Sequence, residues 1–318
     1  MSNFKWIYLL SIIINLISCK ETERKEVTKE IDNNSKTIKI VAQQRPFGEP
    51  LEIDMEVKNA LENLAYANEE DIKIDSLDLV IGIPLENTQI AIPLKYMSAF
   101  EVANFKVESN ILSITWCPIV GTARVFENDD DNSGLDFGYG LNKNNLLVVD
   151  RKTNTVWNQL SGKGILGELS GNKLKSISTI QSTWGFWKNK YPNTKTLMNK
   201  DTSNAVFPQF LDEIPHYNNW KPGDGRPKYE EFHQIETLGL GIDFGNSSIY
   251  FPFNILFKEN SPIYFELEGF KFNVHFDKLG LTAWVENING KMISSTIAYN
   301  WAWKSFYPKT IIYDNKAQ

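Results

Sequence analysis

Apolar and polar residues alternate along most of the chain in short runs, a pattern typical of half-buried β-strands. Clusters of Gly, Asn and Asp separate these runs, and those residue types favour turns. Strands are predicted at residues 77–83, 88–92, 111–116, 124–126, 135–139, 146–150 and 156–159. A chain with so many short strands is expected to be mainly β.

Helical periodicity is rarer. A helix is predicted over residues 57–67, where apolar side chains recur at helical spacing, namely Val57, Ala60, Leu61 and Leu64. Two shorter helices are predicted at residues 183–190 and 295–304, each ahead of a proline. The expected fold class is therefore a β-rich α+β fold with a few short helices.

Two parts of the chain carry the same order of features. Gly82 precedes Pro93 by 11 residues, and Gly241 precedes Pro252 by the same interval. The pattern W-K-x-x-Y-P-x-T occurs at residues 187–194 and again at 303–310. These repeats predict an internal duplication, in which two similar β-units pack as one body with Trp187 equivalent to Trp303 and Gly82 to Gly241.

The repeats also suggest boundaries. The first β-rich unit is expected at residues 41–213 and the second, shorter one at 237–318. Between them, residues 214–236 are rich in Pro, Gly and aromatic residues. This segment is predicted to be either a linker between the two units or a flap across their junction.

The N-terminus predicts export. An apolar run at residues 6–17 follows the single cation Lys5, and it is too short to span a bilayer. Residues 16–19, Leu-Ile-Ser-Cys, resemble the bacterial lipobox, which implies a signal peptide at residues 1–18 and lipidation of Cys19. An uncleaved anchor helix with a chance cysteine is the alternative.

The segment after Cys19 is polar. Residues 19–40 are expected to be a disordered tether, because they contain too few apolar side chains to form a core. The expected location is the bacterial cell envelope, with the protein anchored through lipid. The outer membrane is favoured, with the periplasmic and the surface face both open.

Charge and composition exclude several classes of protein. The chain has 33 Lys and Arg against 39 Asp and Glu, a net charge of −6, and no basic stripe. Nucleic-acid binding is therefore disfavoured, because phosphate recognition requires clustered cations. Two cysteines and three histidines leave no four-cysteine zinc site or disulfide framework. No metal and no cofactor is predicted.

An ordered series of motifs resembles a known family. The series comprises residues 115–123 (TWCPIVGTA), 135–138 (LDFG), 150–153 (DRKT), 157–162 (WNQLSG), 167–171 (GELSG), 183–184 (TW) and 187–194 (WKNKYPNT). It resembles the bacterial domain of unknown function 3179 family, and the resemblance extends from about residue 77 to the C-terminus. It implies fold expectations and candidate positions, without a reaction.

Two positions depart from the family pattern, which resembles T-Y-C-P-L-C-G preceded by a His-Glu pair. Val120 stands where the second cysteine would fall, and Phe100 stands where the histidine would precede Glu101. Paired thiolates, or a thiolate with an imidazole, are what soft-metal binding or thiol exchange requires. The centre therefore looks degenerate, with Cys117 either a small buried hydrophobe or a functional thiol.

The histidines do not restore such a centre. His216, His233 and His275 are scattered, and none lies at helical ligand spacing from another. His275 falls inside an apolar run, where a structural role on a strand is favoured over metal binding. The acidic loop at residues 129–134 imitates half of a calcium loop, but Gly140 stands where its bidentate Glu should be, which favours a solvated hairpin tip.

A second candidate site combines Arg151, Trp157 and Gln159. A guanidinium beside an indole and a carboxamide suits recognition of an anion or a sugar. The structural alternative is that Arg151 pairs with Asp150 or Glu101 while Trp157 fills the core. If the scaffold once housed a functional centre, Glu101 and Cys117 should converge with Arg151, Trp157 or Gln159 around one cleft.

Two classes of function follow. The favoured one is a lipid-anchored envelope protein that is non-catalytic or binds a small molecule or glycan. The alternative is a thiol-dependent or metal-dependent enzyme or redox protein that uses Cys117 with Glu101 as base and Arg151 as electrostatic partner.

Overall fold

The structure, a computed structural model, describes residues 35–42, 51–58, 60–62, 64–67, 71, 74–107, 109–128, 134–199 and 238–315. All of them belong to one compact unit, Asn34–Gln318. The expected signal peptide, Cys19, the linker or flap, and residues 129–133 of the acidic loop lie outside the described residues, as do His216 and His233.

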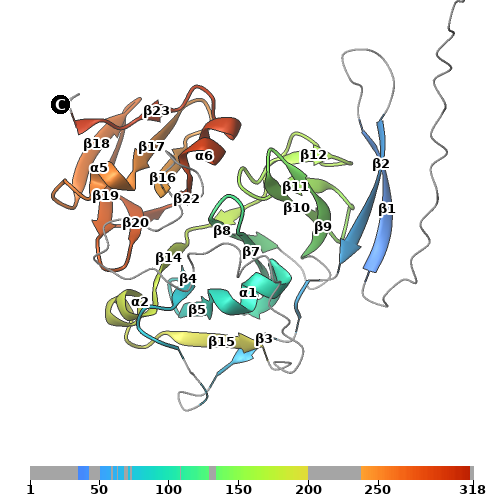
Figure 1. Cartoon of the computed structure of the whole chain (residues 1–318), viewed down its shortest axis with the longest axis horizontal. Helices are drawn as coiled ribbons and strands as arrows, with labels where there is room; N and C mark the ends of the chain where they lie inside the picture. Colours follow the sequence, from blue (N-terminus) through green and yellow to red (C-terminus); the bar gives the residue numbers. More distant parts are fainter. Residues whose placement is uncertain are drawn as a thin grey trace, which may run out of the picture. The chain divides into compact units, whose positions relative to one another are not determined.

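The unit is mainly β, and its five small sheets are arranged like the blades of a five-bladed propeller (Figure 1). One sheet has the order β1 (Ser35–Ala42), β2 (Leu51–Lys58), β9 (Leu135–Asn142), β10 (Asn145–Asp150), β11 (Val156–Asn158), β12 (Gly164–Leu166). The second has the order β13 (Ser176–Ile177), β8 (Thr122–Asn128), β7 (Asn110–Cys117), β6 (Val102–Val107). The third has the order β14 (Ile180–Thr183), β4 (Leu79–Pro84), β5 (Gln89–Pro93), β15 (Lys195–Asn199), β3 (Leu64–Tyr66).

The remaining two sheets are built from the C-terminal part of the chain. Their orders are β22 (Thr296–Tyr299), β16 (Leu238–Asp243), β17 (Ser248–Pro252), β23 (Ile311–Ile312) and β18 (Ile263–Leu267), β19 (Phe270–Asp277), β20 (Thr282–Asn287), β21 (Met292–Ile293). The helices are short: α1 (Leu94–Phe100), α2 (Trp184–Lys190), α5 (Phe253–Leu256) and α6 (Asn300–Phe306). Among the described residues, no helix is both long and apolar enough to cross a bilayer.

Strand order is similar in the two halves. The order β13-β8-β7-β6 matches β21-β20-β19-β18, and β14-β4-β5-β15 matches β22-β16-β17-β23. In the latter two sheets the last strand runs parallel to its neighbour, β15 to β5 and β23 to β17, whereas the other pairs are antiparallel. The first half differs by β1–β3 at its start and by β9–β12, which lie between β8 and β13 in the chain.

Each half closes on a tryptophan that lies over a glycine. Trp187 of α2 covers Gly82 of β4, where an added Cβ would come within 2.2 Å of the indole. Trp303 of α6 covers Gly241 of β16 in the same way, at 2.4 Å. Only glycine leaves room for such a close approach.

The two indoles are also held alike. The Nε1 of Trp187 donates a hydrogen bond to Thr194 Oγ1 at 2.8 Å, and that of Trp303 donates to Thr310 Oγ1 at 2.9 Å. Both indoles are fully buried, so an unpaired N–H would be costly. The threonine that ends the W-K-x-x-Y-P-x-T pattern therefore accepts a hydrogen bond from the buried indole N–H of the tryptophan that begins it.

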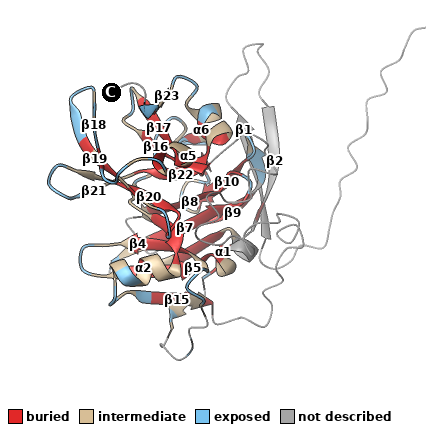
Figure 2. Cartoon of the chain, turned by 60° about the vertical axis from the view of Figure 1, so that its left-hand side comes forward, coloured by how far each residue is buried: buried red, intermediate tan, exposed pale blue. Residues whose placement is uncertain are grey.

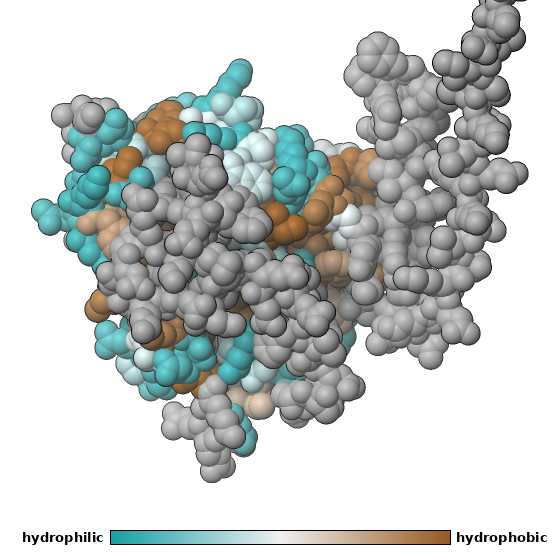
Figure 3. All heavy atoms as spheres, in the orientation of Figure 1, coloured by the Kyte–Doolittle hydropathy of each residue, from teal (hydrophilic) through white to brown (hydrophobic). Residues whose placement is uncertain are grey.

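Buried residues of both halves belong to one core cluster, and Figure 2 shows where the buried residues lie along the ribbon. One core cluster contains Cys117, Val120 and Trp157 together with Leu240 and Trp303. Backbone and side-chain hydrogen bonds cross the same junction: Tyr299 N to Val120 O at 3.1 Å, and Thr122 Oγ1 to Ile297 O at 3.0 Å. Where grey atoms do not cover the face drawn in Figure 3, hydrophobic and hydrophilic residues are interspersed.

The predicted helix at residues 57–67 is wrong. The chain there ends β2, forms a bridge between Leu61 and Ala103, and continues as β3. Leu61 N donates to Val102 O at 2.9 Å, and Asn104 N donates to Leu61 O at 2.9 Å. The four apolar residues are indeed buried. Pairing with β6 satisfies the backbone that a helix would have satisfied internally, so tertiary contacts override the periodicity.

Other boundaries shifted as well. The helix predicted at 183–190 is confirmed as α2, with Thr183 as its N-cap. The helix predicted at 295–304 is partly wrong, because β22 occupies its first half and α6 begins at Asn300. Strand β1 covers Ser35–Ala42 and pairs with β2, so regular structure begins inside the segment expected to be a tether.

The tryptophan-over-glycine contact gives a stability prediction. Gly82→Ala should lower the free energy of unfolding by about 1–3 kcal/mol, because its methyl group would collide with the Trp187 indole. Trp187→Ala and Trp303→Ala should each cost about 3–5 kcal/mol through the cavity they leave. Urea denaturation measures these changes. In the Trp187→Ala background, Gly82→Ala should cost little, and an unchanged cost there would contradict the contact.

Candidate functional site

Glu101 and Cys117 are neighbours through the backbone. Glu101 follows α1, and its N–H closes the helix on Met97 O at 2.6 Å. Its carbonyl accepts a hydrogen bond from Trp116 N at 2.7 Å, one residue before Cys117 on β7. Glu101 has φ 54°, a left-handed backbone conformation that is unfavourable for residues other than glycine. Such local strain is commonly retained at functional sites.

The thiol of Cys117 is enclosed. The residue is 1% exposed and packs in the core cluster with Val120, Trp157 and Leu160. Leu146 N donates a weak hydrogen bond to Sγ at 3.4 Å. Burial, followed by the negative charge of Glu101, raises the pKa of Cys117 to about 11. At neutral pH the thiol is therefore protonated and a poor nucleophile.

Glu101 responds to the same environment. Burial raises the pKa of its carboxyl to about 7. This value suits a group that exchanges a proton at physiological pH, as a general base does. The Glu101 carboxylate also opposes ionisation of Cys117, so the two groups cannot both be charged at little cost.

Gln159 lies beside this pair and is fully engaged. Its Nε2 donates to Thr115 Oγ1 at 3.1 Å and to Thr122 O at 3.0 Å, and its Oε1 accepts from Asn145 Nδ2 at 2.8 Å. The Asn145 side chain in turn bonds Leu160 N at 2.8 Å and lies against the Cys117 thiol. Gln159 thus fixes β7, β8 and β10 relative to one another. Sequence reasoning missed Asn145, a polar residue at the start of an apolar run.

Trp157 does not offer a flat binding face. It is 3% exposed, and its Nε1 donates to Asp150 Oδ2 at 3.0 Å. The same carboxylate accepts hydrogen bonds from the backbone of Lys152, Thr153 and Thr155, which close the turn between β10 and β11. Trp157 is buried in the core, as the structural alternative expected. Its indole N–H also stabilises the turn that Asp150 closes.

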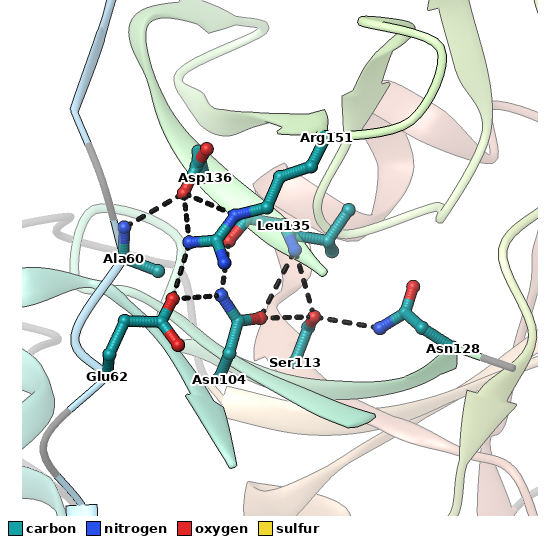
Figure 4. Close-up of polar contacts among 8 residues, drawn as sticks. All are labelled: Ala60, Glu62, Asn104, Ser113, Asn128, Leu135, Asp136 and Arg151. Carbon is teal, nitrogen blue, oxygen red and sulfur yellow. Dashed lines mark hydrogen bonds and ion pairs between the residues drawn. The ribbon is translucent and has the colours of Figure 1, made fainter. Parts of the chain in front are cut away.

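Arg151 is paired with neither Asp150 nor Glu101, so those two expected partners are wrong. Its Nε and Nη2 donate to Asp136 Oδ1 at 3.1 and 2.6 Å, and Nη2 also bonds Glu62 (Figure 4). Asp136 is 2% exposed and also accepts a hydrogen bond from Ala60 N at 3.0 Å. A buried carboxylate requires such partners.

The network continues away from Cys117. Asn104 Nδ2 donates to Glu62 Oε1 at 3.1 Å and to Leu135 O at 3.0 Å, while its Oδ1 accepts from Ser113 Oγ at 2.7 Å (Figure 4). Asn128 then donates to Ser113. Asp136 belongs to the LDFG motif but was not among the candidate site residues, and Asn104 lies outside the motifs. For both, a polar residue inside an apolar strand is a signal of buried pairing.

The five candidates therefore divide between three places. Cys117, Glu101 and Gln159 share one buried region, whereas Arg151 lies in the carboxylate network and Trp157 at the turn after β10. Gln159 lies in the same buried interior as Cys117, whereas Arg151 does not, and the expected convergence around one cleft stays a prediction. Within the described ranges, no group of three His, Cys, Asp or Glu residues is arranged to hold a metal ion.

His275 lies on β19, as expected for a strand residue. Its ring stacks on Trp284 with centroids 4.8 Å apart and planes 6° from parallel, and its Nε2 lies 3.3 Å from Glu286 Oε2. Burial lowers the pKa of His275, and the Glu286 carboxylate partly offsets this.

The fold and site define a mainly β protein with a buried thiol and a partly buried glutamate. The chain belongs to the family of proteins of unknown function DUF3179, whose model matches residues 60–219. This match covers all five candidate residues and ends before β16, so the resemblance of the C-terminal half stays a prediction. No curated protein and no solved structure matches the chain significantly.

The raised pKa of Glu101 gives a pH prediction. Because its folded pKa of about 7 exceeds the unfolded value, its contribution to stability is complete below about pH 4.5 and is lost as the pH rises through 7. Glu101→Gln mimics the protonated form. It should raise the unfolding free energy at pH 8 by roughly 1–3 kcal/mol relative to wild type, with little difference at pH 4.

Chemical denaturation at several pH values measures this difference. The exposed Glu168 provides the matched control, since Glu168→Gln should leave the pH profile unchanged. A Glu101→Gln profile parallel to that of wild type would show that the carboxyl ionises as in water.

Proposed function

We propose that this protein is a lipid-anchored component of the bacterial cell envelope that binds a small ligand without transforming it. The observation that carries the proposal is the state of Cys117: the thiol is buried, its pKa is raised to about 11, and the charge that acts on it is a carboxylate. A catalytic thiol needs the opposite environment, an accessible site with a nearby cation or base that favours the thiolate.

The neighbouring residues support a degenerate centre. Val120, which stands where the family pattern has a second cysteine, is fully buried in the apolar core. Its carbonyl accepts the hydrogen bond from Tyr299 N that ties the two halves together. A metal or a disulfide partner at this position would have to displace core packing, which is costly.

A second candidate function is a thiol-dependent or metal-dependent enzyme or redox protein. It is favoured by the pKa of Glu101 near 7, which would allow this carboxyl to act as a base toward Cys117. It is weakened by Arg151, which is engaged with Asp136 and Glu62 and so does not stabilise a thiolate.

Thiol labelling separates the two functions. At pH 8, a thiol with a pKa near 11 has a thiolate fraction of about one in a thousand, so Cys117 should react with iodoacetamide at least about 100-fold more slowly in the folded than in the unfolded protein. The Cys117→Ser variant, which should fold at modest cost, gives the background from Cys19. Metal analysis of the same sample accompanies it. A thiol that titrates below pH 7, or stoichiometric zinc or copper, would establish the enzyme alternative.

The envelope location is supported by residues 1–19, with their short apolar run and Leu-Ile-Ser-Cys pattern. Lipid on Cys19 would be the contact with the membrane, and several acyl chains would make it stable. We favour the outer membrane.

Mass spectrometry of protein from a bacterial host tests the anchor. Wild type should lack residues 1–18 and carry acyl chains on Cys19, whereas Cys19→Ala should keep residues 1–18 and lack lipid. Cys117→Ser is the matched control and should be processed like wild type. An unmodified Cys19 in the wild-type protein would exclude the lipid anchor.

We also propose that the chain arose by internal duplication. Support comes from the matching strand orders, the two parallel closing strands, and the paired contacts of Trp187 with Gly82 and Trp303 with Gly241. On this proposal β9–β12 are an insertion in the first copy. Superposition of the halves in an experimental structure should bring Trp187 onto Trp303 and Gly82 onto Gly241, and unrelated topologies would exclude it.

A further inference from the structure

We infer that the contact between α2 and β20 responds to acid: it holds the two halves together while His275 is neutral and loosens when His275 gains a proton. Four side chains form this contact, which we call the Trp284 cluster: His275 of β19, Trp284 and Glu286 of β20, and Lys190 of α2. The inference goes beyond the proposed ligand binding and does not depend on it.

The two halves meet at two corresponding junctions (Figure 1). At the first, where β22 lies beside β8, the N-cap residue of α6, Tyr299, donates its backbone N–H to Val120 O at 3.1 Å. At the second, where β14 lies beside β20, the N-cap residue of α2, Thr183, donates its backbone N–H to Gly280 O at 3.1 Å. The backbone contacts are alike, so the side chains decide how the junctions differ.

Trp284 joins the second half to α2. It is 8% exposed and shares a core cluster with Trp187, with Phe186 packed against that cluster. The rings of Phe186 and Trp284 have centroids 5.6 Å apart. Gly280, in the turn before β20, lies so close to α2 that an added Cβ would come within 2.7 Å of Phe186. The second junction therefore depends on how well the Trp284 indole packs.

A cation and an imidazole share this indole. Lys190 Nζ lies 4.3 Å from the centroid of the Trp284 ring, a cation–π distance. The His275 ring stacks on the same indole, with centroids 4.8 Å apart and planes 6° from parallel. A protonated His275 would bring a second positive charge to the ring that holds Lys190, and like charges repel. Protonation should therefore weaken the packing of α2 on β20.

Glu286 offsets this repulsion only in part. Its Oε2 lies 3.3 Å from His275 Nε2 and favours a protonated ring, while its Oε1 accepts a hydrogen bond from Trp284 Nε1 at 2.8 Å. The carboxylate is thus shared with the indole. Burial and the charge of Lys190 act in the opposite direction, and the balance lowers the pKa of His275.

Other titratable groups on the neighbouring elements do not control His275. They are Asp277 and Lys271 of β19, Tyr264 and Glu266 of β18, Lys188 of α2, and Tyr191 after α2. Asp277 Oδ1 accepts a hydrogen bond from Gly280 N at 2.6 Å, and Lys271 Nζ lies 3.8 Å from Glu266 Oε2. Burial, followed by the charge of Glu286, raises the pKa of Tyr191, so this phenol is neutral at pH 7 and below.

The sign of the pH effect follows from the pKa of His275. Because its folded pKa lies below the ordinary value of 6.5, its contribution to stability is complete above pH 6.5 and is lost as the pH falls through that range. The first junction contains Arg124 instead, whose guanidinium stays charged throughout. Acid should therefore loosen the second junction and leave the first closed.

Hydrogen–deuterium exchange of the full-length chain in a neutral detergent tests the inference. Exchange of the imidazole C2–H, followed by mass spectrometry, should give a pKa below 6.5 for His275. Between pH 7.5 and pH 5.0 the protection factor of the Thr183 amide should fall at least about threefold more than that of the Tyr299 amide, since half a pKa unit changes the linked equilibrium by about that factor. Tyr299, at the first junction, is the internal control.

Matched variants assign the response to the cluster. His275→Phe keeps a stacked ring that cannot take up a proton, so the acid response of Thr183 should disappear. His275→Gln provides the same test without the ring. Lys190→Met removes a charge and should raise the pKa of His275 and reduce the response. The control is Lys188→Met on the same helix, where Nζ lies 5.9 Å from the centroid of the Trp184 ring, and it should behave like wild type.

Thermal unfolding at pH 7.5 verifies that each variant is folded. Any of three results would overturn the inference: a His275 pKa of 6.5 or higher, equal loss of protection at Thr183 and Tyr299, or an acid response that persists in both His275→Phe and His275→Gln.

Discussion

The close approach of a tryptophan to a glycine is the contact on which both halves of the fold depend. In each half the indole lies directly on a central strand, which brings the short helix down onto the sheet. The chain that leaves the helix then reaches the far side of the sheet, where β15 and β23 add as parallel strands. A side chain at Gly82 or Gly241 would lift the helix and so detach the closing strand. One steric constraint thus fixes helix, turn and last strand together.

The junction between the halves depends on polar contacts inside an apolar core. Arg124 of β8 is buried, and its Nη1 donates to Leu160 O at 2.7 Å and to Thr296 Oγ1 at 2.8 Å. A buried guanidinium is tolerated only when such acceptors are placed for it. These bonds join β8 to β22 and to the loop that follows β11. The strands β8, β11 and β22 belong to three different sheets. The junction is therefore specific as well as hydrophobic.

Local sequence patterns predicted those strands and helices whose formation depends on nearby residues. The strands β4, β5, β7 and β10, and helix α2, follow from alternation, from Gly and Asn turns and from the repeated tryptophan pattern. The region around Leu61 could not be predicted in this way, because its backbone partners lie on β6, about 40 residues away in the chain. Arg151 is similar: its partners, Asp136 and Glu62, meet only after β9 and β10 have paired. Proximity in sequence suggested Asp150, which instead closes its own turn.

The candidate site shows the same division. The sequence grouped Glu101 and Cys117 with Arg151, Trp157 or Gln159. In the structure, the Trp116–Glu101 hydrogen bond ties β7 to the end of α1. Their chemistry depends on burial, which no motif encodes.

Burial also limits the chemistry that the region around Cys117 can support. Around Cys117 a low dielectric holds the thiol protonated and raises the pKa of Glu101, so charge is disfavoured there. An ionic ligand is therefore poorly accommodated beside the thiol. Val120, fully buried in the same core, supplies no polar side chain that could offset this cost.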